Sequence, residues 1–77
     1  MKDIIQENIS QSLAFQIGKE LFENYKSECE FPEDDWISIS KNWDLNLWTD
    51  DGHYKAAIYP VNEDGDINVL NEIMISE

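Results

Sequence analysis

The sequence predicts an α+β fold, in which one N-terminal amphipathic helix packs on a three-stranded antiparallel β-meander. Two patterns support this prediction. Up to residue 27, apolar residues recur every fourth position, as on one face of an α-helix. From residue 36 they recur every second position, as in a β-strand with one buried face. A chain of 77 residues, 42% of them hydrophobic, is expected to fold as one small domain spanning 1–77.

The helix is expected over about residues 3–27. Asp3 and Gln6, three residues apart, offer a capping-box start. Gly18 weakens a helix by about 1 kcal/mol relative to alanine, so we expect the backbone to approach the sheet closely there. Phe15 lies off the apolar stripe and is expected to be exposed. The stripe consists of Ile5, Ile9, Leu13, Ile17 and Leu21, widened by Phe22 and Tyr25.

An acidic loop is expected over residues 28–35, where a proline and five acidic residues end the helix. One strand is then expected over about 36–49. A two-residue turn at Lys41-Asn42 would set Ile39 against Asp44, an apolar residue against a polar one. The unbroken alternation of apolar and polar residues instead favours a single strand with a bend or bulge near that point.

Two further strands are expected at about 53–61 and 67–75. Asp51-Gly52 is a strong signal for a tight hairpin turn between the first two strands. The register that this turn implies pairs Leu47 with Ala56 and Leu45 with Ile58 on the core face, and Trp48 with Lys55 and Asp44 with Tyr59 on the other.

The register of the last strand stays open between two alternatives. After a tight turn at Asp64-Gly65, the residues on the core face would be Val69, Ile73 and Ile75. After a longer loop they would be Leu70 and Met74.

Acidic residues dominate the second half of the chain. The formal net charge is −12. Residues 1–27 hold three lysines and four acidic residues, whereas residues 28–77 hold two lysines and thirteen acidic residues. Such an excess repels phosphate and anionic lipid and attracts a basic surface. We therefore expect a protein partner with a basic surface, no direct contact with nucleic acid and no membrane association.

The sequence also predicts where the protein works. A single cysteine, Cys29, excludes an internal disulfide. Residues 1–7 lack the apolar stretch of a signal peptide, and no apolar run approaches the roughly 20 residues needed to span a bilayer. These features predict a cytoplasmic protein, and the cytoplasm could be that of an infected host cell.

No residue stands in a context typical of catalysis or of cofactor binding. His53 follows a turn and has no evident partner or pocket, so we interpret it as an exposed turn residue. Cys29 lies between two glutamates, which disfavour the reactive thiolate. Neither acidic turn fits the ligand spacing of an EF-hand calcium loop. The chain is therefore predicted to be a non-enzyme without a cofactor or metal centre.

The sheet face that the helix leaves open is the candidate binding surface. Trp36, Trp48 and Tyr59 would lie on it, and tryptophan and tyrosine are common interface hot spots. Acidic residues would form a rim around this aromatic centre. Two alternatives are that the face closes a homodimer, and that its aromatic residues stiffen a thin sheet through cross-strand contacts. The predicted partner-binding residues are Glu28, Glu30, Glu33, Asp34, Asp35, Trp36, Asp44, Trp48, Asp50, Asp51, Tyr59, Glu63, Asp64 and Asp66.

In general character the chain resembles the phage-encoded DNA mimics that block restriction enzymes, CRISPR effectors or repair glycosylases. The resemblance lies in composition and carries over no individual residue. It implies a small inhibitor of the anti-CRISPR or anti-restriction type, which binds the basic nucleic-acid-binding surface of a target protein. Two alternatives are kept: an immunity or antitoxin-like protein that plugs a nuclease or toxin active site, and a homodimeric accessory subunit whose acidity serves solubility only.

The first two of these functions differ in the arrangement of carboxylates that they require. A DNA mimic would present its carboxylates in a line or a double row, because successive phosphates of a backbone are regularly spaced. A plug would instead gather its carboxylates around one anchor, such as Trp36 or Trp48.

Overall fold

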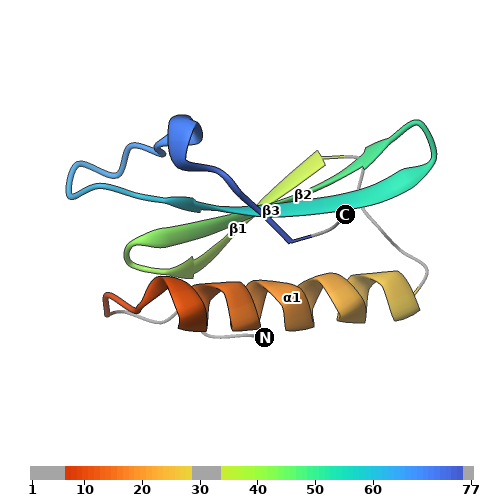
Figure 1. Ribbon diagram of the computed structural model, residues 1–77, viewed down its shortest axis with the longest axis horizontal. Coiled ribbons are helices and arrows are strands. Elements are labelled where there is room, and N and C mark those ends of the chain that lie inside the picture. The colour runs from red at the N-terminus through yellow and green to blue at the C-terminus, as the bar shows by residue number, and fades with distance from the viewer. Residues whose placement is uncertain (1–6, 29–33, 76–77) are drawn as a thin grey trace.

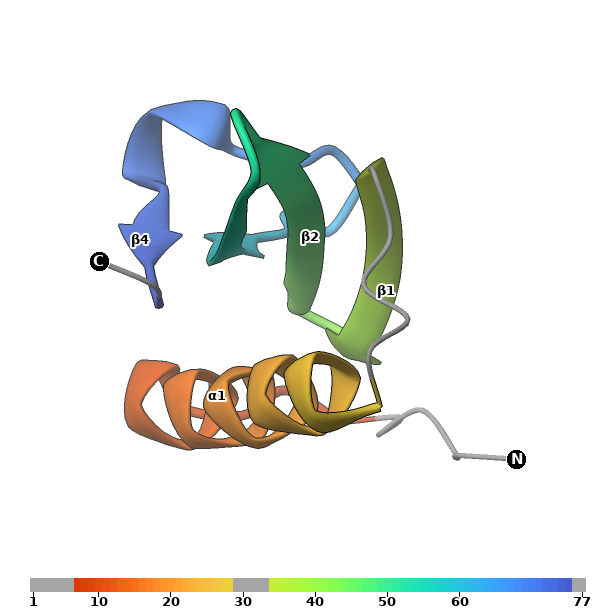
Figure 2. The same ribbon diagram turned by 90° about the vertical axis from the view of Figure 1, so that its right-hand side faces the viewer.

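The computed structural model describes residues 7–28 and 34–75, and these form a helix lying against one face of an antiparallel sheet (Figure 1). The α+β class is thereby confirmed. The sheet has four strands in the order β1-β2-β3-β4, not three. The elements are α1 (Gln11–Ser27), β1 (Asp34–Ser40), β2 (Trp43–Asp50), β3 (His53–Pro60), the 3-10 helix η1 (Val69–Asn71) and β4 (Ile73–Met74). Figure 2 shows the helix and the sheet as two layers, with β1 and β4 at opposite edges.

The helix begins later than the sequence predicted. Residues 7–10 are not helical, and the helix starts at Gln11. Ser10 caps it, because its hydroxyl oxygen accepts a hydrogen bond from the backbone N–H of Leu13 at 3.2 Å. The predicted capping pair, Asp3 and Gln6, lies outside the described residues. The predicted end at residue 27 agrees with the structure.

The buried face of α1 is displaced from the predicted stripe. Residues four apart advance by about 40° around a helix of 3.6 residues per turn, so a stripe with that spacing drifts away from any fixed face. Because Leu21 is buried, Leu13, which lies eight residues earlier, is rotated away from the buried face, and it is 42% exposed. Phe15, which was predicted to be exposed, is partly buried against the core instead. The buried residues of the helix are Ala14, Gly18, Leu21 and Phe22.

At Gly18 the helix backbone closely approaches the sheet, as predicted. A β-carbon at this position would lie 2.7 Å from Cδ1 of Ile75 and 3.0 Å from Cγ2 of Ile58. Both distances are shorter than a normal contact between carbon atoms, which is about 3.5–4.0 Å. The missing side chain therefore lets the helix backbone pack directly on the side chains of the sheet.

A hairpin turn at Lys41-Asn42 separates β1 from β2, so the prediction of one strand over 36–49 is wrong. The objection to this turn was that it would pair Ile39 with Asp44. The structure removes the mismatch with a register shift, in which Ser40 pairs with Trp43 and Ser38 pairs with Asp44. Ile39 is the extra residue of this bulge. The alternation consequently continues through the turn, which is why the sequence looked like one strand.

The β2–β3 hairpin has the predicted register. Asp51 and Gly52 form its turn, with φ angles of 51° and 80°. Positive φ at both central residues is characteristic of the type I′ turn that matches the twist of a hairpin. The four predicted pairs are all present, namely Leu47–Ala56, Leu45–Ile58, Trp48–Lys55 and Asp44–Tyr59.

The last predicted strand, 67–75, is broken into three short pieces. A single bridge joins Val61 to Ile67, η1 follows, and β4 then pairs with β3. Ile73 and Ile75 pack against the core, as expected after a tight turn. Val69 does not, since it lies on η1 and is 64% exposed.

The hydrophobic core lies between α1 and the sheet face that the helix covers. Strands β2 and β3 supply its largest fully buried side chains, which are Leu45, Leu47 and Ile58. Because the helix can cover only one face of the sheet, the other face depends on its own side chains and on the C-terminal segment for cover (Figure 1).

Candidate functional site on the outer sheet face

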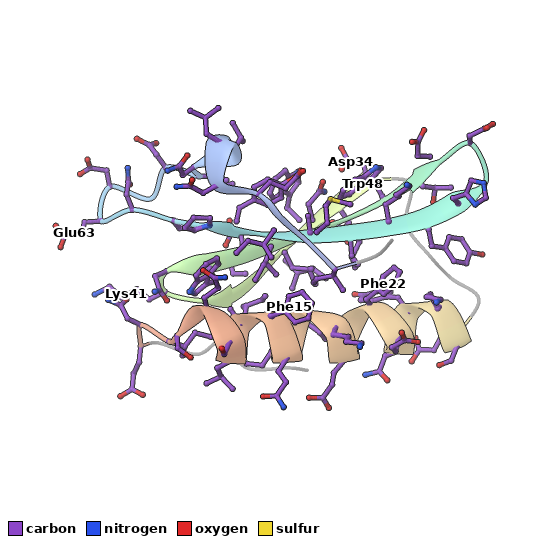
Figure 3. All side chains as sticks on the ribbon, in the orientation of Figure 1. Phe15, Phe22, Asp34, Lys41, Trp48 and Glu63 are labelled. Carbon is purple, nitrogen blue, oxygen red and sulfur yellow. The ribbon has the colours of Figure 1, made fainter. Side chains whose placement is uncertain are left out.

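The outer face, meaning the sheet face turned away from α1, is built from three cross-strand rows. Strand pairing sets Asp34 beside Trp48 and Lys55, Trp36 beside Asn46, Ala57 and Met74, and Ser38 beside Asp44 and Tyr59. Figure 3 shows Asp34 and Trp48 above the sheet, on the side opposite the helix residues Phe15 and Phe22. The alternation of the strands thus collects acidic, amide and aromatic side chains on one surface.

Trp36 and Tyr59 form the aromatic centre of this face. Their ring centroids are 5.2 Å apart with an angle of 45° between the ring planes, a favourable tilted arrangement. Trp36 is 45% exposed. Tyr59, which was predicted to be displayed on the surface, is buried. The centre of the outer face therefore presents the Trp36 ring supported by a buried tyrosine, and Trp48, on the same face beside Asp34, is partly exposed.

Asn46 fixes the position of Asp34 at the edge of the aromatic centre. The buried Asn46 side chain donates through Nδ2 to Oδ1 of Asp34 at 2.9 Å and to the carbonyl oxygen of Asp35 at 3.0 Å. Asp34 and Asp35 were predicted to belong to a loop, but both lie in β1. Sequence reasoning placed Asn46 on this face and missed its role, because alternation reveals the face of a residue and not its hydrogen bonds.

Glu72 joins the site from the segment between η1 and β4. The Tyr59 hydroxyl donates a hydrogen bond to Oε2 of Glu72. Burial, this hydrogen bond and the negative charges of Glu72 and Asp34 together raise the pKa of Tyr59 to about 12. Two carboxylates therefore act electrostatically on one phenol. Glu72 was not among the predicted site residues, since the broken path of the last segment is not visible in the sequence pattern.

Asp44 lies on the same face, diagonally across from Trp36. Partial burial raises the pKa of Asp44, and a hydrogen bond from the Ser38 side chain opposes that shift. Within the described parts of the chain one ion pair forms, between Lys26 Nζ and Glu23 Oε1 on the helix, at 3.9 Å. The carboxylates of the outer face thus have no ion-pair partner among residues 7–28 and 34–75.

The predicted acidic rim is divided between two ends of the sheet. Asp50 and Asp51 lie at the β2–β3 turn. The second acidic group, Glu63, Asp64 and Asp66, follows β3 at the opposite end (Figure 1). These turn acids are exposed and lie apart from the aromatic centre.

Three other predicted residues lie in or beside the segment between α1 and β1. Glu28 is exposed at the C-terminal cap of α1, where its backbone N–H donates to the carbonyl oxygen of Asn24 at 3.1 Å. Glu30 and Glu33 lie outside the described residues. Of the predicted site residues, the structure thus brings together Asp34, Trp36, Asp44, Trp48 and Tyr59.

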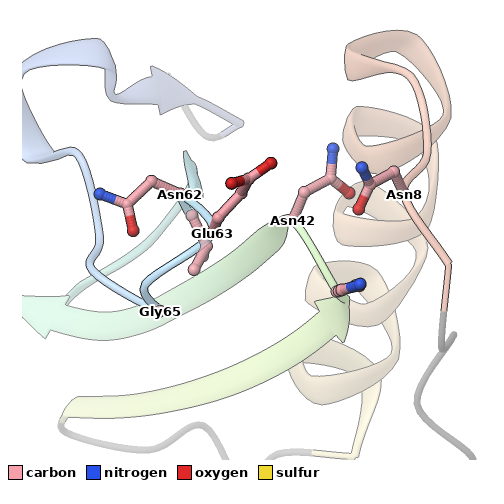
Figure 4. Close-up of a pocket in the computed structure, with 7 residues that line it drawn as sticks. Asn8, Asn42, Asn62, Glu63 and Gly65 are labelled. Atoms are coloured by element: carbon pink, nitrogen blue, oxygen red, sulfur yellow. The ribbon is translucent and has the colours of Figure 1, made fainter.

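A cavity of about 310 Å³ lies at the end of the sheet that carries Glu63 (Figure 4). Two of the amides that line it hold the backbone in place. Asn42 Oδ1 accepts the backbone N–H of Ile9 at 3.0 Å. Asn62 Oδ1 accepts the N–H groups of Asp64 and Asp66, each at 2.9 Å. The amide oxygens of Asn42 and Asn62 thus serve the fold.

His53 and Cys29 were the two side chains weighed singly as candidates for chemistry. His53 is exposed at the start of β3, and Cys29 lies outside the described residues. Residues 7–28 and 34–75 contain no group of three or more histidine, cysteine or acidic side chains placed to hold a metal ion. In the same parts of the chain, no helix is both long enough and apolar enough to cross a membrane.

Comparison with known proteins does not identify a relative. The sequence matches no protein-family model, and neither the curated proteins nor the solved structures contain a significant match. The site must therefore be interpreted from its own geometry.

Proposed function

We propose that this protein is a non-enzymatic inhibitor that binds the basic nucleic-acid-binding surface of a target protein through its outer sheet face. One observation supports this proposal above the others. Trp36 stands half exposed on that face, among the carboxylates of Asp34, Asp44 and Glu72, which have no ion-pair partner among the described residues. An aromatic anchor with unpaired acids around it is suited to a basic protein surface.

The aromatic centre would supply affinity. Tryptophan is enriched among interface hot spots, because it buries a large apolar area at a small cost in conformational entropy. Trp36 is already held against Tyr59 at a centroid distance of 5.2 Å. A side chain fixed before binding loses less freedom in the complex, which favours association.

The negative charge would supply speed and selectivity. A formal net charge of −12 on 77 residues produces a long-range attraction toward basic surfaces. Such attraction raises the association rate and disfavours acidic partners, while the buried contacts determine the rate of dissociation. The exposed acids at the two ends of the sheet would contribute mainly to this attraction.

A nucleic-acid-binding surface is the basic surface that this arrangement fits best. Proteins gather lysine and arginine where they neutralise phosphates, and carboxylates bind the same side chains through charge-assisted hydrogen bonds. Inhibitors of the anti-CRISPR or anti-restriction type act in this way, in the cytoplasm where their targets meet DNA.

A second candidate is an immunity or antitoxin-like protein that plugs the active site of a nuclease or toxin. One observation favours it. Asp34 and Asp44 lie on either side of Trp36 instead of forming a row along a strand, and this is the arrangement expected of a plug. Both candidates use the same face and the same kind of partner, so one experiment addresses them together.

The experiment is affinity capture from a lysate of the native host, followed by competition with duplex DNA. We expect capture of a basic protein that binds nucleic acid, and we expect DNA to displace it. Trp36→Ala should reduce the capture by about tenfold or more, the typical effect of removing a hot spot.

Leu13→Ala is the matched control, because Leu13 is 42% exposed on the helix and Trp36 is 45% exposed on the outer face. It should leave the capture unchanged. Equal losses for the two variants, or a captured protein that DNA does not displace, would contradict the proposal. Recovery of the protein itself alone would indicate a homodimer.

A further inference from the structure

We propose that the outer face binds an arginine side chain of its partner, with the guanidinium stacked on Trp36 and held by the carboxylates of Asp34 and Asp44. This inference rests on the proposed function and adds to it the chemistry of the residue that is recognised. The proposed occupant is one basic side chain of a partner protein, because the negative charge of the outer face attracts a cation.

The strand register places the indole between two carboxylates. Asp34 and Trp36 are alternate residues of β1, which sets them about 6.8 Å apart on one face. Trp36 pairs with Asn46 on β2, so Asp44 is its diagonal neighbour, about 7–8 Å away and displaced in the opposite direction along the strands. A planar cation lying on the indole would have a carboxylate on each side.

Asp34 is oriented before any partner arrives. Asn46 Nδ2 donates to its Oδ1 at 2.9 Å, and Asn46 is itself fixed by a second hydrogen bond to the carbonyl oxygen of Asp35. The other oxygen, Oδ2, belongs to a side chain on an exposed residue. One carboxylate oxygen is therefore anchored while the other stays available to a donor, and this lowers the entropic cost of binding.

Asp44 is the second carboxylate that would receive the guanidinium. Its carboxylate is partly buried, which raises its pKa because burial disfavours the charged form. A desolvated carboxylate normally gains from a nearby positive charge, and no described lysine forms an ion pair with Asp44. A cation bound beside Asp44 would offset the cost of desolvating its carboxylate.

Arginine fits this arrangement better than lysine does. The guanidinium is planar, stacks on an aromatic ring and carries donors in a fixed fork that reaches carboxylate oxygens. The lysine ammonium is a compact, strongly hydrated charge. It can lie over a ring, as Lys26 does over Phe22, but it has no planar fork of donors to reach two carboxylates. The tilt of Trp36 against Tyr59 supports the indole from one side and leaves it 45% exposed for a stacked partner.

The test uses the whole protein and two small probes, N-acetyl-arginine amide and N-acetyl-lysine amide, in an NMR titration. Trp36→Phe identifies the indole N–H signal of Trp36 by its disappearance. We expect the arginine probe to shift that signal and the side-chain amide of Asn46 in a saturable manner. The lysine probe should bind more weakly than the arginine probe, by a factor of about five or more. The Trp43 indole, which donates to the carbonyl oxygen of Ile9, should stay unshifted.

Asp34→Asn and Asp64→Asn form a matched pair, because each removes one negative charge from an exposed position. Asp34→Asn should weaken binding of the arginine probe about fivefold, whereas Asp64→Asn should change it little. Backbone signals that are unchanged beyond the surroundings of each substituted residue would show that both variants are folded. Equal binding of the two probes, or equal effects of the two variants, would overturn the inference.

The test separates this inference from the proposed function. If capture of a basic protein depends on Trp36 while the arginine probe binds no better than the lysine probe, the proposed function stands and the arginine site is wrong. If the arginine probe binds at Trp36 while capture is unaffected by Trp36→Ala, the site stands and the proposed function is wrong.

Discussion

Asn42 holds both backbone polar groups of Ile9 through its side-chain amide. Nδ2 donates to the carbonyl oxygen of Ile9 at 3.2 Å, and Oδ1 accepts its N–H at 3.0 Å. The Trp43 indole N–H donates to the same carbonyl oxygen at 3.1 Å. The segment that precedes α1 is thereby fixed to the β1–β2 turn, 33 residues away in the sequence.

Replacing Asn42 with alanine should therefore destabilise the fold. The change leaves the Ile9 N–H and the Ser40 hydroxyl without their acceptor, and an unsatisfied polar group costs about 1–3 kcal/mol when it is buried. We expect a loss of about 2 kcal/mol in the free energy of unfolding, measured by urea denaturation. Asn8→Ala, at an exposed neighbouring position, should change little. Similar effects of the two substitutions would show that the Asn42 amide does not fix this segment.

The same turn shows where sequence reasoning failed and why. Alternation correctly placed Ile37, Leu45 and Leu47 on one face, and the β2–β3 register followed from that pattern and from Asp51-Gly52. The turn at Lys41-Asn42 was rejected because a regular antiparallel pairing around it would set apolar residues against polar ones. A bulge adds one residue to one strand, so it preserves the parity that a plain turn would break. Parity by itself cannot distinguish a bulged hairpin from one long strand.

Gly18 should not tolerate a larger side chain. Its α-carbon lies so close to Ile58 and Ile75 that even a β-carbon would be within 3.0 Å of both. Gly18→Val should destabilise the fold by about 1–3 kcal/mol in thermal or urea unfolding, the usual cost of overpacking. Gln16→Val, at an exposed position of the same helix, measures the helix propensity of valine without the clash. A loss no larger at position 18 than at position 16 would mean that the helix can move away from the sheet.

Alkaline pH should destabilise the protein through Tyr59. Its pKa is raised to about 12 from the ordinary value of 10.0, so the folded state retains a proton that the unfolded state loses. The stability that this group contributes is fully present below pH 10 and declines as the pH rises toward about 12. Urea denaturation over this range should show the decline, and Tyr59→Phe should reduce its slope.

Tyr54→Phe is the control for the alkaline measurement, since Tyr54 is a half-exposed tyrosine on the same strand. Tyr59→Phe should reduce the slope more than Tyr54→Phe does. A slope that is the same in the parent protein and in Tyr59→Phe would show that Glu72 and Asp34 do not hold the proton on Tyr59.

Added salt should stabilise the fold. A net charge of −12 opposes compaction, and salt screens repulsion between exposed charges over a distance of about 10 Å at 0.1 M. We expect the melting temperature to rise between low and moderate concentrations of sodium chloride. Neutralising Glu63, Asp64 and Asp66 together should raise the melting temperature at low salt and diminish the further rise. A melting temperature that does not depend on salt would contradict the role assigned to self-repulsion.

The candidate site was only partly predictable. The face that carries Trp36, Trp48 and Asp44 followed from alternation. The contributions of Asn46 and Glu72 did not, because they depend on hydrogen bonds to residues that are distant in the sequence. The burial of Tyr59 also escaped prediction, since its neighbours Trp36 and Glu72 come from other elements. The alternation of residues along a strand reveals which sheet face a side chain occupies. Contacts between residues distant in the sequence determine whether that side chain is buried and which hydrogen bonds it makes.

The most direct test of the outer face as the binding surface is photocrosslinking in the native host. A photoreactive phenylalanine analogue would replace Trp36 in one variant and Leu13 in another, two positions of similar exposure, one on the outer face and one on the helix. We predict that irradiation joins a basic, nucleic-acid-binding protein to position 36 and not to position 13. Adducts from position 13 alone, the same adducts from both positions, or no adduct from position 36 would contradict this account.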